Sequence, residues 1–406
     1  MILPVIAWRN IWRNPTRSAV LIGAITVGIW SLIFITGFMQ GITVSYIRQA
    51  IETRTSHIQV HDPEFKDDME IKYMIEDQGR WERLLSSDDQ VKAYSLRTKI
   101  SGMLSTSRGS YGVVLEGVDP GPEALTTKLS EQVVEGIYMD TSQYNPIMVS
   151  SELAKKLKAK IQSKVVFQFQ QLDGEISAAA FRVSGIYDSG NAKADQGKAY
   201  AYREDINKLA GLPQDATHEI AILLQDISMI DTIRDQWQAQ FPDLLVESYA
   251  QISPDLKLFE SQIQISMLTM TIIFMLALIF GIINTMLMAV LERVKELGML
   301  MAIGMNRWRV FVMIMLETIT LALVAAPLGL LLGWRTIEWL GRTGVDLSIY
   351  AEGMKQFGMA AMVYPEIDAV YYVQILSAVC TTAVIGAIYP AWKAIHLKPV
   401  EALRKL

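Results

Sequence analysis

Two histidines come closest to forming a metal site in this chain. His57 and His61 lie four positions apart in the run SHIQVHD, a spacing that places both rings on one side of a strand or a helix. Zinc sites in proteins use three or four ligands, and the sequence places no further cysteine or histidine near this pair. We therefore expect a pair of histidines beside a strand and no bound metal.

No catalytic constellation stands out elsewhere in the sequence. The 406 residues contain no G-x-x-x-x-G-K-[ST] loop, the motif whose backbone cradles the phosphates of ATP. We expect no catalytic residue and no cofactor in this chain, so ATP and magnesium would have to be bound by a separate ATPase.

Glu317 is the single charged residue in the apolar run 310–334. Ionisable groups inside membranes are costly and often mark functional sites. Two interpretations remain open: a structural salt bridge to an arginine of the N-terminal or the central segment, or a role in relaying movement.

A charged, helix-patterned stretch, ERVKELGMLMAIGMNRWR, occupies residues 292–309 between two apolar runs. On a 3.6-residue period its apolar and charged residues fall on different faces. The small residues Gly298, Ala302 and Gly304 would let another protein approach closely, which a docking element needs. The alternative is an ordinary basic helix that connects two membrane spans.

Composition places the chain between soluble and membrane proteins, with 51% apolar residues. Runs of about 20 apolar residues cross a bilayer as helices, and four such runs occur. We expect an α-helical membrane protein with a large α+β extracytoplasmic domain between helices 1 and 2. The expected segments are an amphipathic N-terminal helix (1–17), helix 1 with a stalk (18–47), the outer domain (48–260), helix 2 (261–291), a cytoplasmic helix (292–309), helix 3 (310–334), a short outer loop (335–368), helix 4 (369–390) and a tail (391–406).

Basic residues flank these runs on one side, which the positive-inside rule assigns to the cytoplasm. They cluster before the first run, between the second and third, and after the fourth. We therefore expect a multi-pass protein of the inner membrane with both termini in the cytoplasm. The net charge of −5 gives no reason to expect a nucleic-acid partner.

The N-terminal segment ILPVIAWRNIWRNPTR suits a helix in the membrane interface, where it would contact lipids. Its expected anchors are Trp8, Arg9, Trp12, Arg13 and Arg17. An unstructured basic leader is the alternative.

The outer block contains several strand-like runs rich in Val, Ile and aromatic residues. These are SHIQV, SYGVVLEGV, KVVFQFQ, FRVSGIYD and EIAILLQD. Helices are expected at 151–161 and 229–241, and two sub-lobes are expected to meet near 119–131 and 188–198. Apolar residues continue at helical spacing beyond the first span and before the second, which predicts two stalks.

The chain resembles the four-span permeases of mechanotransmitting (type VII) ABC transporters. This family includes the lipoprotein-releasing, macrolide-exporter and cell-division permeases. The resemblance is carried by ERVKELGMLMAIG with the following Arg307, by Glu317 before a glycine-rich span, by YPAWKAIHLKPVEALR and by RNIWRNPTRS. GFMQG, SHIQVHD and VESYAQISPDLK are similar to the lipoprotein-releasing branch, whereas RNIWRNPTR is closer to the general exporter pattern.

The resemblance implies that the segment 292–304 is a coupling helix that docks on an ABC ATPase, with two permeases, identical or related, paired to two ATPases. The implied coupling residues are Glu292, Arg293, Lys295, Glu296, Leu297, Gly298, Ala302, Gly304 and Arg307. ATP-driven closure of the ATPases would move the coupling helices, the stalks and the outer domain.

Three functions follow from the resemblance, two in transport and one outside it. The first is extraction of lipoproteins or similar amphiphiles from the outer leaflet and their delivery to a periplasmic carrier. The second is export of peptides or drugs from the periplasm with an adaptor and an outer-membrane channel. The third is activation of a cell-wall hydrolase. A receptor or scaffold without an ATPase is the alternative from a different class.

Overall fold

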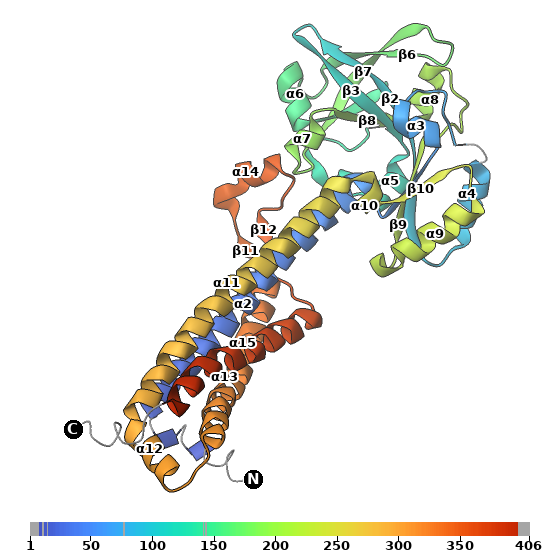
Figure 1. The fold of residues 1–406 in the computed structure, drawn as a ribbon. Coiled ribbons are helices and arrows are strands. Elements are labelled where there is room, and N and C mark those ends of the chain that lie inside the picture. The colour runs from blue at the N-terminus through green and yellow to red at the C-terminus, as the bar shows by residue number, and fades with distance from the viewer. Residues whose placement is uncertain are drawn as a thin grey trace. The chain divides into compact units, whose positions relative to one another are not determined.

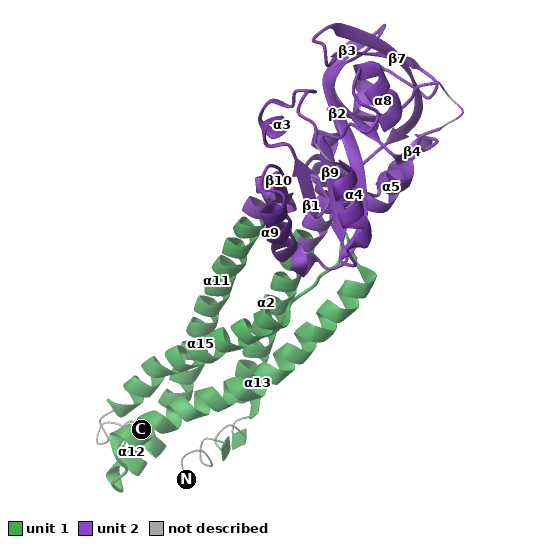
Figure 2. Ribbon diagram, turned by 90° about the vertical axis from the view of Figure 1, so that its right-hand side faces the viewer, with its two compact units in different colours: residues 1–43, 260–346, 362–406 green, residues 44–259, 347–361 purple. Residues whose placement is uncertain are grey.

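A computed structural model describes residues 8–9, 12–13, 15–75, 78–140, 142 and 144–396, without the side chain of Arg17. The described chain divides into two compact units (Figure 2). Unit 1 comprises 1–43, 260–346 and 362–406, and unit 2 comprises 44–259 and 347–361.

Unit 1 consists of long helices that lie side by side, with a short helix at one end (Figures 1 and 2). The described residues contain four helices long and apolar enough to cross a membrane, which confirms the predicted fold class. The elements of this unit are α2 (Pro15–Ala50), α11 (Pro254–Glu292), α12 (Val294–Ala302), α13 (Arg307–Thr343), α15 (Ala369–Ile395) and the two-residue strands β11 (Val345–Asp346) and β12 (Met362–Val363).

Glycines bring the helices of unit 1 close together. A Cβ atom at Gly329 would lie 2.7 Å from Ile29 Cβ, and one at Gly333 would lie 2.6 Å from Ile33 Cδ1. Both distances are shorter than such atoms can approach. The Gly-x-x-x-Gly spacing in α13 therefore packs directly against α2. Gly41 of α2 meets the backbone of Tyr364 in the same way.

Two of the spanning helices, α2 and α11, are longer than a helix needs to be to cross a bilayer. The boundary between the units falls inside α2 and inside α11, and each helix is continuous across it. The segments predicted as stalks therefore begin as direct continuations of the spanning helices. α13 also continues past the predicted end at 334, because the sequence RTIEWLGRT is compatible with helix until Gly344, which adopts a φ of +74°.

Unit 2 is built on one mixed sheet. In the described residues this sheet has ten strands in the order β10-β1-β9-β2-β3-β8-β5-β7-β4, and β6 pairs with β2 and β7. The strands are β1 (Ile58–His61), β2 (Val91–Thr106), β3 (Gly109–Val118), β4 (Val133–Gly136), β5 (Pro146–Ser150), β6 (Lys164–Gln170), β7 (Ile176–Tyr187), β8 (Lys198–Tyr202), β9 (Glu219–Leu224) and β10 (Leu245–Ser248).

Unit 2 also contains short helices, several of which pack against this sheet (Figure 1). They are α3 (Pro63–Asp68), α4 (Gln78–Ser87), α5 (Pro120–Thr126), α6 (Ser151–Leu157), α7 (Ala192–Asp195), α8 (Arg203–Ala210), α9 (Ile230–Gln240), α10 (Tyr249–Ile252) and α14 (Ala351–Gln356), with single turns at Ile51–Thr55, Leu129–Gln132, Ile227–Met229 and Ser348–Tyr350. The helix predicted at 151–161 ends earlier, because Lys158 adopts a left-handed conformation that caps α6.

Unit 2 has two main hydrophobic cores, which receive residues from different parts of β2: Leu96 belongs to one, and Ile100 and Leu104 belong to the other. The core with Leu96 contains the stacked rings of Trp81 and Phe241, and the other contains Phe167 and Phe181. β2 serves both, because its first half pairs with β9 and its second half with β3 and β6. The predicted sub-lobes therefore share one sheet.

Residues 347–361 belong to unit 2 and contain α14, whereas the sequence predicted only a short outer loop over 335–368. Lys355 forms an ion pair with Asp188, and a Cβ at Gly358 would lie 2.5 Å from Asn191 Nδ2. Gln49, near the end of α2, donates a hydrogen bond to the carbonyl of Ser189 at 3.0 Å. The loop around residues 188–191 thus joins α2, α14 and the sheet.

Candidate functional site

The segment 292–309 is divided among three elements, which corrects the prediction of one helix. Glu292 ends α11, Val294–Ala302 form α12, and Arg307 begins α13. The second break has two local causes. Gly304 has a φ of +104°, and the Asn306 side chain accepts a hydrogen bond from Trp308 N at 3.0 Å, which caps α13.

One face of α12 packs against the other helices of unit 1. Leu297 and Gly298 are buried, and Leu297 belongs to the same hydrophobic core as Ile282 and Val310. We expected Gly298 to allow a partner protein to approach closely, but Gly298 is buried within unit 1. Ala302 and Gly304 are the small residues that remain exposed.

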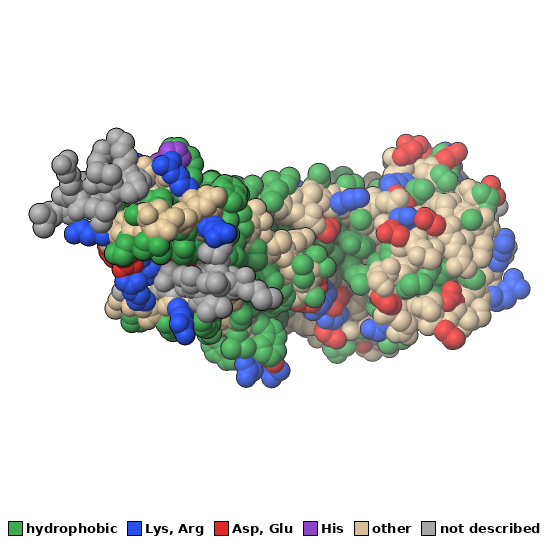
Figure 3. Space-filling view, turned by 60° about the horizontal axis from the view of Figure 1, so that its bottom comes forward, with side chains coloured by type: hydrophobic (Ala, Val, Ile, Leu, Met, Phe, Trp, Pro, Cys, Tyr) green, Lys and Arg blue, Asp and Glu red, His purple; other side chains and the backbone are tan. Residues whose placement is uncertain are grey.

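The outer face of this region combines apolar and basic side chains. Met299 is 54% exposed, Ile303 79% and Trp308 64%. Lys295 and Arg307 are also exposed. Figure 3 shows Lys and Arg side chains gathered at this end of unit 1. Exposed apolar residues rimmed by charges are typical of a protein–protein interface.

A buried ion pair ties the start of α12 to a spanning helix. Arg293 Nη1 lies 3.0 Å from Glu317 Oε1, and the two side chains are 12% and 10% exposed. Arg293 occupies the junction between α11 and α12, while Glu317 lies in α13. This pair confirms the predicted salt bridge between Glu317 and an arginine of the central segment.

Arg13 from the N-terminal segment pairs with Glu296 of α12, at 2.9 Å between Nη1 and Oε2. Both side chains are largely exposed, so the pair itself adds little stability. Together, Arg13, Arg293, Glu296 and Glu317 line a cavity of about 320 Å³ whose remaining walls are mostly apolar. The N-terminal segment, α11, α12 and α13 therefore meet around charged groups.

The N-terminal anchors are described in part. Trp8 and Trp12 are exposed with ring centroids 6.0 Å apart, and Arg9 is exposed. The backbone is helical at these residues, and residues 1–7, 10, 11 and 14 of the predicted helix lie outside the described part of the chain. The side chain of Arg17 lies outside the described part of the chain.

The two predicted histidines are hydrogen bonded within unit 2. His57 Nδ1 accepts a hydrogen bond from Leu224 N at 2.9 Å, and His61 Nε2 lies 3.2 Å from Gln59 Oε1. His218, which the sequence analysis did not single out, accepts from Lys99 N and lies 2.9 Å from the Ile71 carbonyl. Burial is the largest influence that lowers the pKa of His57 and of His218 to about 4.

These shifts predict that unit 2 becomes less stable in acid. The ordinary histidine pKa is 6.5, so in the unfolded chain both histidines bind protons below about pH 6.5. In the folded chain, His57 and His218 bind protons only near pH 4. The stability that comes from keeping these rings neutral is therefore fully present above pH 6.5 and is lost as the pH falls toward 4. We expect the thermal midpoint, followed by tryptophan fluorescence, to fall across this window.

The variant that tests this is His57→Asn, which retains an acceptor for Leu224 N. His57→Asn should make the midpoint less dependent on pH than it is in the wild type. Identical pH profiles for the wild type and His57→Asn would contradict the assignment.

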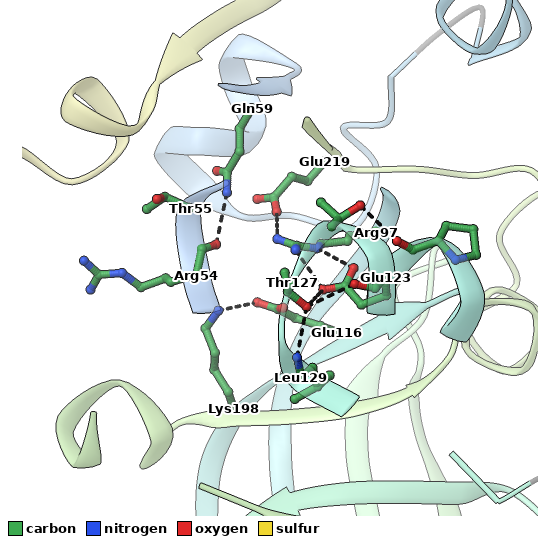
Figure 4. Close-up of polar contacts among 12 residues, drawn as sticks. Arg54, Thr55, Gln59, Arg97, Glu116, Glu123, Thr127, Leu129, Lys198 and Glu219 are labelled. Atoms are coloured by element: carbon green, nitrogen blue, oxygen red, sulfur yellow. Dashed lines mark hydrogen bonds and ion pairs between the residues drawn. The ribbon is translucent and has the colours of Figure 1, made fainter. Parts of the chain in front are cut away.

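Sequence reasoning missed a buried ion network in unit 2 (Figure 4). Arg97 donates two hydrogen bonds to Glu123, at 3.0 and 2.8 Å, and one to Glu219 at 2.7 Å. Lys99 also binds Glu219, and Lys198 Nζ lies 2.8 Å from Glu116 Oε1. Burial opposes ionisation of Glu219, but Lys99 and Arg97 bring its pKa below the ordinary value. The network stays charged and links β2, β3, β8, β9 and α5.

The fold and these features define a class: a multi-pass membrane protein with a mixed α+β domain inserted between its first two spanning helices. Comparison with known families gives the particular group. Residues 18–240 match the MacB-like periplasmic core domain, and residues 268–399 match the FtsX-like permease C-terminal domain. The chain belongs to this family of permeases, and its α+β domain is the periplasmic domain.

Curated relatives support the same assignment. A macrolide export ATP-binding/permease protein MacB from Nitrobacter winogradskyi is 23% identical over 97% of this chain and 58% of its own length. A MacB from Syntrophobacter fumaroxidans is 29% identical over 30% of this chain and 15% of its own length. A lipoprotein-releasing system transmembrane protein LolC from Xylella fastidiosa is 22% identical over 72% of each chain. The chain thus spans less than two thirds of the length of these MacB relatives.

Among solved structures, the periplasmic region of MacB from Actinobacillus actinomycetemcomitans matches 51% of this chain and 95% of its own length. The sequence identity is 13% and the TM-score is 0.37.

Proposed function

We propose that this chain is the permease subunit of an ABC transporter, and that it couples ATP hydrolysis by a separate ATPase to movement of its periplasmic domain. The supporting observation is the exposed face around α12, where Met299, Ile303 and Trp308 stand beside Lys295 and Arg307. The sequence has no phosphate-binding loop of its own. This face is therefore the site that an ATPase would contact.

The proposed coupling runs through rigid elements. Displacement of α12 would act on α13 through the Arg293–Glu317 pair and on α11 through the single residue that separates the two helices. α2 and α11 are continuous helices, and each has one end in unit 2. They would therefore carry the displacement to the periplasmic domain. We further propose an inner-membrane location, cytoplasmic termini and α12, and a complex of two permeases with two ATPases.

Lipoproteins or similar amphiphiles are the proposed substrate. A groove of about 610 Å³ in unit 1 has apolar walls that include Met267, Leu268 and Ile375. Gln264 and Gln374 also line it and supply polar groups. A groove that is apolar with a few polar groups suits an acyl chain joined to a polar head. The likeness to LolC over 72% of the chain supports this choice.

Export of peptides or drugs with an adaptor is the second candidate, because the curated MacB relatives are named for macrolide export. Proteoliposomes that contain the permease and its ATPase distinguish the two. ATP-dependent release of an acylated lipoprotein to a periplasmic carrier would support the first function. Export of a macrolide without lipoprotein release would support the second.

The docking surface has its own test. Ala302→Trp places a large ring on the exposed face of α12, so we expect it to prevent close approach of the ATPase and to lower ATP-dependent release by about tenfold or more. Membrane insertion should be unchanged. Leu331→Trp, an exposed position on α13, is the matched control and should have little effect. Equal activity of Ala302→Trp and the wild type would exclude docking at this face.

A further inference from the structure

Unit 2 carries a concentration of positive charge that the proposed coupling does not use. Residues 151–164 include five lysines and one carboxylate, Glu152, in a chain whose net charge is −5. The run begins in α6 and continues through the turn that follows it. Lysines near a helix C-terminus stabilise the helix, and those of the last turn of α6 fit that role. Arg108, which lies beside them, comes from the turn between β2 and β3 and has no part in that helix.

These charges line a groove. Arg108, Lys155, Lys158 and Lys160 border an open depression of about 720 Å³, together with Val134 and Glu135 of β4. We call this depression the basic groove. Lys155 pairs with Glu152 at 2.9 Å, but the four basic residues outnumber the two carboxylates on or beside the groove. A concave surface with excess positive charge attracts an acidic ligand.

One wall of the basic groove is the edge of the sheet. In the described part of the chain, β4 stands last in the strand order and pairs with β7 on one side. Val134 is 58% exposed, and Ile137, just after the strand, is 62% exposed. An edge strand offers backbone N–H and C=O groups to a further strand, and proteins usually protect such edges. Among the described strands, none pairs with the other side of β4, so its backbone groups there are available to a further strand.

We propose that the basic groove binds an acidic, extended segment of a partner protein, which adds a strand to the edge of β4. Backbone hydrogen bonds to β4 would supply part of the affinity, and Val134 would contact apolar side chains of the added strand. Arg108, Lys158 and Lys160 would attract its carboxylates. An anionic membrane surface could satisfy the lysines, but it has no backbone to pair with a strand edge.

The test uses the full chain in nanodiscs of neutral lipid and a fluorescent octapeptide that alternates glutamate and valine. We expect the peptide to bind, and Lys158→Glu/Lys160→Glu to weaken binding by about tenfold or more at low salt. Lys92→Glu/Lys208→Glu changes the net charge equally at exposed positions elsewhere in unit 2 and should leave affinity within about twofold. An unchanged thermal midpoint in both variants shows that folding is intact.

A second peptide tests the strand pairing. N-methylation at alternate residues removes backbone donors while the charge stays the same, so this peptide should bind much more weakly. Equal binding of both peptides, or equal loss in both double variants, would overturn the proposal. So would binding of phosphatidylglycerol vesicles through Lys158 and Lys160 without binding of the peptide. None of these results depends on ATP, so they leave the proposed coupling untouched.

Discussion

Arg97→Met is expected to lower the free energy of unfolding of unit 2 by about 3 to 5 kcal/mol, the usual effect of removing one partner from a buried ion pair. The guanidinium makes three hydrogen bonds to Glu123 and Glu219, which are each 1% exposed. Without it, Glu123 loses its charged partner in a buried region, and Glu219 keeps Lys99 as its neighbouring cation. Urea unfolding followed by tryptophan fluorescence measures the loss.

Two further variants show whether the loss comes from the unpaired carboxylate of Glu123. Arg97→Met/Glu123→Leu removes it and should recover part of the stability. Arg234→Met breaks pairs with the exposed Asp231 and Asp235 and should cost no more than about 1 kcal/mol. If Arg97→Met were no more harmful than Arg234→Met, the network would have no structural role.

Glu317→Gln is expected to separate ATP hydrolysis from substrate release. The variant removes the charge that faces Arg293, 3.0 Å away, and weakens the link between α12 and α13. Breaking a buried pair of this kind typically costs about 3 to 5 kcal/mol, enough to populate other positions of α12. We expect release per ATP hydrolysed to fall by about tenfold or more, with hydrolysis continuing.

The control for Glu317→Gln is Glu296→Gln. It breaks the exposed pair with Arg13, so its effect on coupling should be small. Arg293→Gln/Glu317→Gln tests whether an unpaired charge alone is harmful. If this double variant restored full coupling, the charges would not be needed for coupling, and the ion pair would have a structural role only. Wild-type release in Glu317→Gln would rule out both the relay and the structural importance of the pair.

Hydropathy predicted the four spanning helices well, because a long apolar run has few alternatives to a helix in lipid. The helix ends were less predictable. They depend on the positive φ angles of Gly304 and Gly344 and on the Asn306 cap. For that reason α13 extends beyond the apolar run, and the segment 292–309 divides into three elements.

Alternation of apolar residues predicted the strands β1, β3, β6, β7 and β9. It missed β2, the longest strand, because Arg97 and Lys99 interrupt the apolar pattern. Their charges are balanced by Glu219 from β9 and Glu116 from β3, residues far away in the sequence. A sequence signal did exist: single charged residues occur inside otherwise apolar strands.

The candidate site could be predicted as a segment but not as a surface. Helical periodicity placed charges and small residues on faces, yet it could not say which face the other helices cover. The structure buries Gly298 and exposes Ala302. The pairing of Glu317 was predicted only as one of two possibilities, because the position of Arg293 depends on the break between α11 and α12.

The central claim is that force applied at α12 reaches the periplasmic domain. It is tested most directly by the distance between spin labels at Lys208→Cys in unit 2 and Arg342→Cys in α13, with the native Cys380 replaced by Ala. The complex with its ATPase would be measured with and without bound ATP. We predict that ATP shifts the distance distribution and that Ala302→Trp abolishes the shift. The same distribution in both nucleotide states would contradict transmission through the helices.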